Sequence, residues 1–197
     1  MKTIETKVFA FNELSEQAKA VALDTNRDFN TSDEYWFEST TEDAKAIGDL
    51  FGIDIDNIYF SGFCHQGQGA QFVGNYSYKK GGLKAVKEYA PLDTNLHDIV
   101  KELQETQRRN FYSLSANVET NGMYSHEMAT SITVEDSRSD YGATEQAEEE
   151  TTEVLRSFMQ WIYSKLEDEN DYQTGDEAIA ESLQANGMEF LIDGSNY

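Results

Sequence analysis

The chain has 197 residues, of which 39% are hydrophobic and 12% aromatic, so it can fold one compact domain and is not wholly disordered. Its 37 Asp and Glu against 15 Lys and Arg give a net charge of -22, which disfavours direct binding to nucleic acid or to an acidic membrane. One cysteine excludes an intrachain disulfide, and no apolar run approaches the roughly 20 residues of a membrane span. We therefore expect a soluble protein of a reducing cytoplasm.

Apolar spacing and turn residues predict the elements of the first half of the chain. They are a strand at 4–11, a helix at 16–27 capped by Ser15, a helix at 33–51 capped by Ser32 or Thr31 and ended by Gly52, and strands at 53–60 and 70–78. In helix 16–27 the expected buried stripe is Ala18, Val21, Ala22 and Thr25. The two later strands form a hairpin around a glycine-rich connection.

The second half contains a further hairpin among helices. Its predicted elements are a helix at 83–89 before Pro91, a helix at 95–109 capped by Thr94, strands at 111–120 and 124–134 joined by Asn121-Gly122, helices at 144–169 and 175–186, and an edge strand at 188–192. This order predicts an α+β fold: an antiparallel sheet of two hairpins (53–78 and 111–134), helices packed on it, and a long acidic C-terminal helix. We expect a single domain over 1–197, with 136–143 as the candidate sub-boundary.

The connection at 61–70 has the most chemical character. Gly62, Gly67 and Gly69 allow backbone N–H groups to converge on a ligand, as anion-binding nests do. Its candidate contacts to a ligand or partner are Ser61, Phe63, His65, Gln66 and Gln68. The alternative is a tight, bulged hairpin in which glycine serves only the backbone. The segment does not match a phosphate-binding loop, because no Lys-Ser or Lys-Thr follows Gly69.

Catalytic and metal chemistry find little support in the sequence. Cys64 and His65 are adjacent and should point to different sides, so they do not predict a nucleophile with its base. The three histidines, His65, His97 and His126, lack metal-site spacing, and Asp54 and Asp56 share a strand face without further ligands. We expect no catalytic residue, no metal and no cofactor.

Acidic residues concentrate towards the C-terminus. Residues 135–197 carry 17 acids against three bases and 1–134 carry 20 acids against 12 bases, while 79–109 is locally basic. Within the long helix and after it, the candidate partner-binding carboxylates are Glu145, Glu148, Glu149, Glu153, Glu167, Asp168 and Asp171. One interpretation is an acidic face that keeps the protein soluble. The other is a surface that imitates or competes with a polyanion.

A resemblance covers most of the chain. Its central motif is the FSGF segment Phe60–Phe63, followed by Gln66-Gly67-Gln68-Gly69-Ala70-Gln71-Phe72. It continues through Tyr78-Lys79-Lys80-Gly81, Gln107–Tyr112 and Trp161-Ile162-Tyr163. These segments resemble small acidic accessory proteins of tailed bacteriophages and prophages, some of them labelled antitoxin-like. That pattern often has Asp where this chain has Gln68. The resemblance implies a viral accessory role in the cytoplasm of a bacterial host and implies no catalytic residue.

Two functional hypotheses follow. The first is a phage-encoded, non-enzymatic acidic protein that binds a basic surface of a host defence or toxin protein and inhibits it, with mimicry of nucleic acid as one mechanism. The alternative is a binding protein that sequesters a nucleotide-type ligand through 61–70. Neither hypothesis involves a membrane or direct nucleic-acid binding, and the sequence leaves the oligomeric state open.

Overall fold

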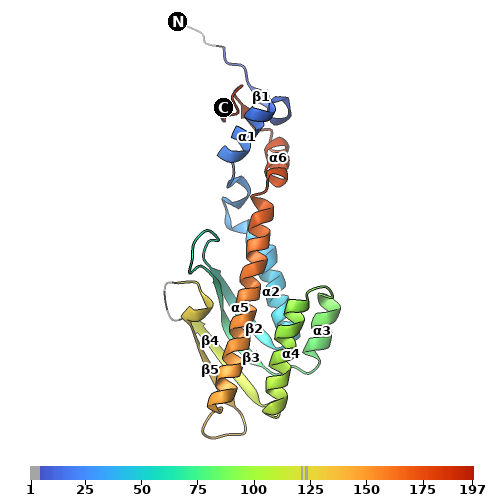
Figure 1. Ribbon diagram of the computed structural model, residues 1–197, viewed down its shortest axis with the longest axis vertical. Helices are drawn as coiled ribbons and strands as arrows, with labels where there is room; N and C mark the ends of the chain where they lie inside the picture. The colour runs from blue at the N-terminus through green and yellow to red at the C-terminus, as the bar shows by residue number, and fades with distance from the viewer. Residues whose placement is uncertain (1–4, 121, 123) are drawn as a thin grey trace. The chain divides into compact units, whose positions relative to one another are not determined.

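The computed structural model describes residues 5–120, 122 and 124–197, which form two compact units (Figure 1). Unit 1 combines the two ends of the chain, up to Glu38 and from Asp168 onwards, whereas unit 2 spans Ser39–Glu167. The expected sub-boundary at 136–143 lies inside unit 2. Folding of the whole chain as one domain stays a prediction.

Unit 2 is built on a four-stranded antiparallel sheet. In spatial order its strands are β2 (Ile53–Phe60), β3 (Ala70–Ser77), β4 (Leu114–Thr120) and β5 (Thr130–Asp136). Ile58 lies opposite Phe72 in the first hairpin, and Val118 lies opposite Ile132 in the second. Gly52 ends the preceding helix as expected: its φ is +98°, and an added Cβ would lie 2.0 Å from the Ser77 carbonyl oxygen.

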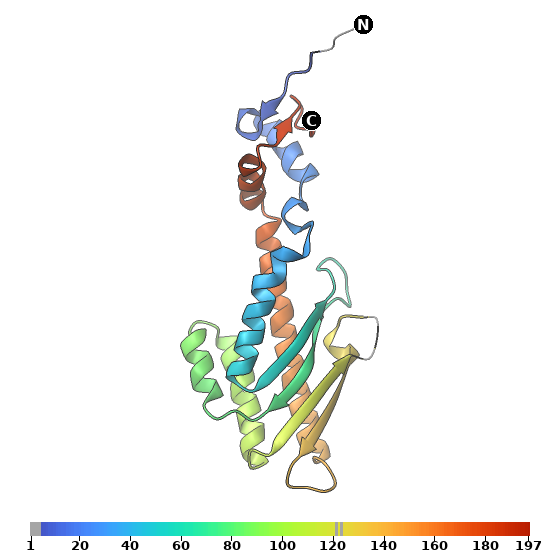
Figure 2. The same ribbon diagram turned by 180° about the vertical axis from the view of Figure 1, so that it is seen from behind.

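Helices cover one face of this sheet (Figures 1 and 2). They are α2 (Glu38–Leu50), α4 (Thr94–Arg109) and the first part of α5 (Glu145–Gln173), while α3 (Gly82–Tyr89) packs against α4. Phe158 of α5 is fully buried, with ring centroids 6.1 Å from Phe72 and 5.0 Å from Phe51. Alternate residues such as Asn75 and Asn117 lie exposed on the other face and hydrogen-bond each other at 3.2 Å. The predicted α+β fold is confirmed.

The second hairpin differs in its boundaries from the prediction. β4 begins at Leu114 rather than at 111, because Phe111 and Tyr112 have φ values of 57° and 63° and form a left-handed turn after α4. β5 begins at Thr130 rather than at 124, because 127–129 form a short 3-10 helix. Since Thr120 pairs with Thr130, the connection is longer than the two-residue turn expected there. Asn121 of that turn lies outside the described residues.

Unit 1 is a small helical module with a two-stranded ribbon. β1 (Phe9–Ala10) pairs antiparallel with β6 (Glu189–Phe190), and α1 (Glu16–Thr25) lies beside α6 (Asp176–Ala185) (Figure 1). Their shared core consists of Phe11, Leu14, Ala18, Ala22, Ile179, Leu183 and Phe190. Ser15 caps α1 as expected, accepting a hydrogen bond from the Ala18 amide at 3.3 Å. The predicted burial of Val21 and Thr25 was wrong, since both are exposed.

Candidate interaction surface

All seven predicted partner-binding carboxylates lie on α5 and are exposed. Glu145, Glu148, Glu149 and Glu153 gather within its first nine residues, and we call these four the α5 acidic patch. Glu167 follows about 21 Å further along the helix axis. Asp168 and Asp171 belong to unit 1, whereas the patch and Glu167 belong to unit 2. The structure therefore brings together the first four of the seven.

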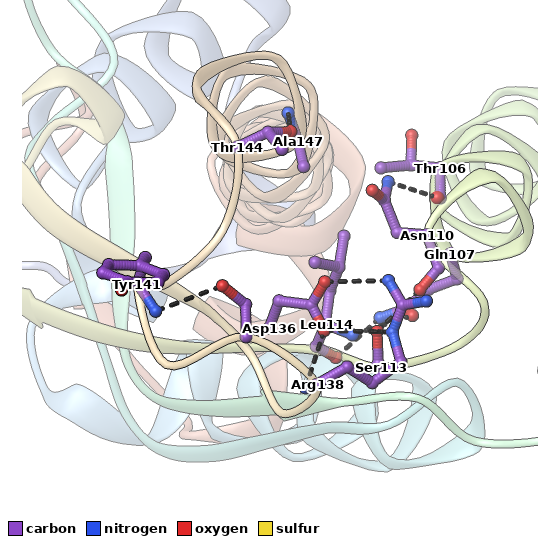
Figure 3. A network of polar contacts seen from close by, with 11 residues as sticks. Thr106, Gln107, Asn110, Ser113, Leu114, Asp136, Arg138, Tyr141, Thr144 and Ala147 are labelled. Carbon is purple, nitrogen blue, oxygen red and sulfur yellow. Dashed lines mark hydrogen bonds and ion pairs between the residues drawn. The ribbon is translucent and has the colours of Figure 1, made fainter.

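The α5 acidic patch is held by a helix whose other side is firmly packed. Ala147, Thr151, Val154 and Leu155 are at most 2% exposed, so this part of α5 is fixed against the core of unit 2. Thr144 caps the helix, because its Oγ1 accepts a hydrogen bond from the Ala147 amide at 3.2 Å (Figure 3). Negative side chains in the first turn also complement the helix dipole. The patch is thus anchored through its backbone rather than through its carboxylates.

Glu150, which lies beside the patch on α5, is paired with a positive charge. Its Oε2 lies 2.6 Å from an Arg109 guanidinium nitrogen, and this hydrogen bond lowers the pKa of the Glu150 carboxyl. Among the residues that the structure describes, no ion pair is found for the four carboxylates of the α5 acidic patch. Glu102 and Glu105 of α4 also act electrostatically on Arg109. The patch therefore presents uncompensated negative charge.

The loop at 61–69 is held both by its own side chains and by contacts with other segments. The Ser61 hydroxyl accepts a hydrogen bond from the Gly69 amide at 3.0 Å, and Gln68 Oε1 accepts one from the His65 amide at 2.6 Å. Phe63 stacks on Tyr163 of α5 with ring centroids 5.3 Å apart. Three of the five predicted contacts thus shape the loop, whereas the side chains of His65 and Gln66 are exposed. Ligand binding at this loop stays a prediction.

A strained corner between α4 and β4 escaped the sequence analysis. Phe111, in the left-handed region, is 73% exposed, and Arg138 Cζ lies 4.4 Å from its ring centroid. Arg138 also donates to Asp136 at 2.9 Å and to the Ser113 hydroxyl at 2.8 Å (Figure 3). The hydrogen bond from Arg138 lowers the pKa of the Asp136 carboxyl to about 2. Asn110, which caps the C-terminus of α4, was the one local signal for this turn.

Buried Gln107 fixes the conformation of this corner. Its Nε2 donates to the Leu114 carbonyl oxygen at 2.7 Å, and its Oε1 accepts from the Leu114 amide at 3.3 Å. The Gln107 carbonyl oxygen also accepts a hydrogen bond from the Tyr112 amide at 2.7 Å. These bonds compensate for the left-handed backbone at Phe111 and Tyr112, which costs about 1–2 kcal/mol for each residue.

The residues that the structure describes also bear on metal binding and on membrane insertion. They contain no group of three or more His, Cys, Asp or Glu side chains arranged to hold a metal ion. Within the same part of the chain, we find no helix with the length and apolar character needed to span a bilayer.

Comparison with known proteins identifies a family. A family model described as a domain of unknown function, DUF8835, matches residues 36–176, more than two thirds of the chain. This range contains all of unit 2 with the α5 acidic patch and the loop at 61–69, whereas α1 lies outside it. No curated protein and no solved structure matches. The chain belongs to the DUF8835 family.

Proposed function

We propose that this chain is a non-enzymatic interaction protein that binds a basic surface of another protein through the α5 acidic patch. The observation that carries the proposal is the set of four exposed carboxylates, with which no described residue forms an ion pair, on a helix whose opposite side is buried. Because the helix is already fixed, a partner gains these charges without ordering the backbone that bears them. The net charge of -22 adds a long-range field that accelerates encounter with a cationic surface.

The size of the patch limits the nucleic-acid surface that it can imitate. Glu145 and Glu153 are eight residues apart, or about 12 Å along the helix axis. Duplex DNA carries about seven charges over this length, at one charge per about 1.7 Å. The patch supplies four of them, and exposed Glu102 and Glu105 extend negative charge on the neighbouring helix. The proposed partner surface is thus a compact cluster of Lys or Arg that matches about a third of a turn of duplex.

The resemblance to phage accessory proteins supports a narrower form of this proposal. In that form the partner is a host defence or toxin protein whose nucleic-acid-binding surface is occluded by the α5 acidic patch. Binding then inhibits the partner directly, because carboxylates occupy the positions that phosphates would take. Loss of the four charges should release the inhibition.

The proposal is tested by tagged capture of proteins from a bacterial lysate over a salt series. The test variant carries E145Q, E148Q, E149Q and E153Q. At about 0.5 kcal/mol for each exposed ion pair, it should lose about 2 kcal/mol of binding, or roughly thirtyfold in affinity. Capture by the unchanged chain should fall as ionic strength rises from about 0.05 to 0.5 M.

A matched control separates the patch from general acidity. The control carries D54N, D56N, E119Q and E135Q, which remove four exposed carboxylates from the open face of the unit 2 sheet. Both variants change the net charge by the same amount. Equal loss of capture in the two variants, or capture that is insensitive to salt, would contradict a specific role for the α5 acidic patch.

A further inference from the structure

Unit 1 contains a groove between α1 and α6, outside the surface described above. Its apolar floor is formed by Phe11, Ala20, Val21, Leu23 and Ala180. Val21 is 42% exposed there, whereas Ala18 and Ala22 of the same helix are buried in the core of unit 1. The side chains of Ala20 and Ala180 are small, so a third element can approach the backbones of both helices closely.

The rim of this groove is acidic. Its four carboxylates are those of Glu16, Asp24, Asp176 and Glu177. The two bases of the groove are each engaged by one of these carboxylates: Lys19 lies 2.9 Å from Glu16, and Arg27 lies 2.5 Å from Asp176. In the described part of the chain, no ion pair is found for Asp24 or Glu177, and both are exposed. Unpaired negative charge therefore lies on both sides of the apolar floor, on α1 and on α6.

The surroundings of the groove reinforce this charge. The segments that form unit 1 contain 16 Asp and Glu but four Lys and Arg in 68 residues. Unit 2 contains 21 acids and 11 bases in 129 residues, so the net negative charge per residue is more than twice as high in unit 1. A segment that docks here must combine apolar side chains with positive charge.

We propose that the α1–α6 groove docks an amphipathic helix of a basic partner protein, with its apolar stripe on Val21 and its Lys or Arg side chains at the acidic rim. α1 and α6 each have ten residues, or about 15 Å, which matches about three turns of an added helix. This inference rests on the proposed function, because the basic character of the partner is taken from it. It adds a second contact, whose recognition is apolar as well as ionic.

The test measures binding of a labelled synthetic peptide to the full chain by fluorescence anisotropy at about 0.15 M salt. The peptide has about 14 residues, with Leu along one helical face and Lys elsewhere. The comparison peptide has the same composition, with Leu distributed around the helix. We expect the amphipathic peptide to bind about tenfold more tightly than the comparison peptide. Only in the amphipathic peptide do all leucines lie on one face and contact the floor at the same time.

Variant Val21→Asp separates apolar docking from simple charge attraction. It adds a negative charge, so attraction alone would tighten binding of the cationic peptide, whereas loss of the apolar floor should weaken binding about tenfold. Ile192→Asp is the matched control: Ile192 is in the same unit, 78% exposed and not part of the groove lining. It should leave the affinity unchanged or slightly raise it.

Each outcome decides the inference. Weaker binding to Val21→Asp together with retained binding to Ile192→Asp supports the groove. Equal affinity for the two peptides, tighter binding to Val21→Asp, or absence of binding would overturn it. The variant without the four charges of the α5 acidic patch distinguishes the two proposals. If it keeps partner capture while Val21→Asp loses the peptide, the proposed function fails and the groove stands. If it loses partner capture while Val21→Asp keeps the peptide, the proposed function stands and the groove fails.

Discussion

Because the backbone at Phe111 is left-handed, we predict that glycine at this position is more stabilising than alanine, the opposite of the usual order. Phe111→Ala and Phe111→Gly both remove the exposed ring and its contact with Arg138, so these losses cancel when the variants are compared. At a φ of 57°, Ala retains a strain of about 1–2 kcal/mol that Gly does not have. Gly loses about 0.5–1 kcal/mol more entropy on folding. The Gly variant should therefore be more stable than the Ala variant by about 1 kcal/mol.

Urea denaturation followed by tryptophan fluorescence measures this difference, because Trp161 is buried in unit 2 against Phe158. In thermal unfolding the expected difference is about 2–4 °C in Tm for a chain of this length. Glu102, exposed in the middle of α4, provides the control, since there Gly should be less stable than Ala by about 1 kcal/mol. A Phe111→Ala variant as stable as Phe111→Gly, or more so, would refute the left-handed conformation.

Three further predictions concern single side chains. Gln107→Leu should lower the free energy of unfolding by about 2–3 kcal/mol, because buried backbone groups of Leu114 lose their partner; an unchanged urea midpoint would contradict this. Asp136 has a folded pKa of about 2, below its unfolded pKa of about 3.9. Its ionised carboxylate therefore stabilises the fold fully above about pH 3.9, and this stabilisation is lost as pH falls towards 2. Asp136→Asn should therefore flatten the stability profile between about pH 4 and 2, as urea midpoints over a pH series would reveal. Exposed Cys64 should react with one equivalent of a thiol reagent without denaturant, and protection from the reagent would show that the loop is covered.

Helix periodicity in the sequence predicted the helical layer of unit 2 well. Leu96, Ile99, Val100 and Leu103 recur at helical spacing within the predicted helix 95–109, and all four are buried. Such a stripe is local, because residues three and four apart share a helix face whatever packs against it. The start of β4 was placed too early, since the alternation at 111–120 also fits a strand. The turn that interrupts it depends on Gln107 bonding to Leu114, a contact between elements that periodicity does not encode.

The candidate surfaces were predictable to different degrees. Exposure of the α5 acidic patch followed from the apolar stripe on the opposite side of the helix. The distinction between Glu149 and Glu150 did not, because it depends on Arg109 approaching from another helix. The groove in unit 1 was also missed, because Ala18, Ala20 and Ala22 give α1 too little contrast to define which side is buried. Val21 was assigned inward for that reason.

The packed side and the outer side of α5 differ in the amino-acid substitutions that they tolerate. Substitutions at the four outer glutamates leave Thr151, Val154 and Leu155 in place, so they should cost little stability, as exposed substitutions usually do. Under the proposed function, charges on this outer side can be rearranged while the scaffold is preserved. Under the proposed function, such a helix lets recognition change from one relative to another without a new fold.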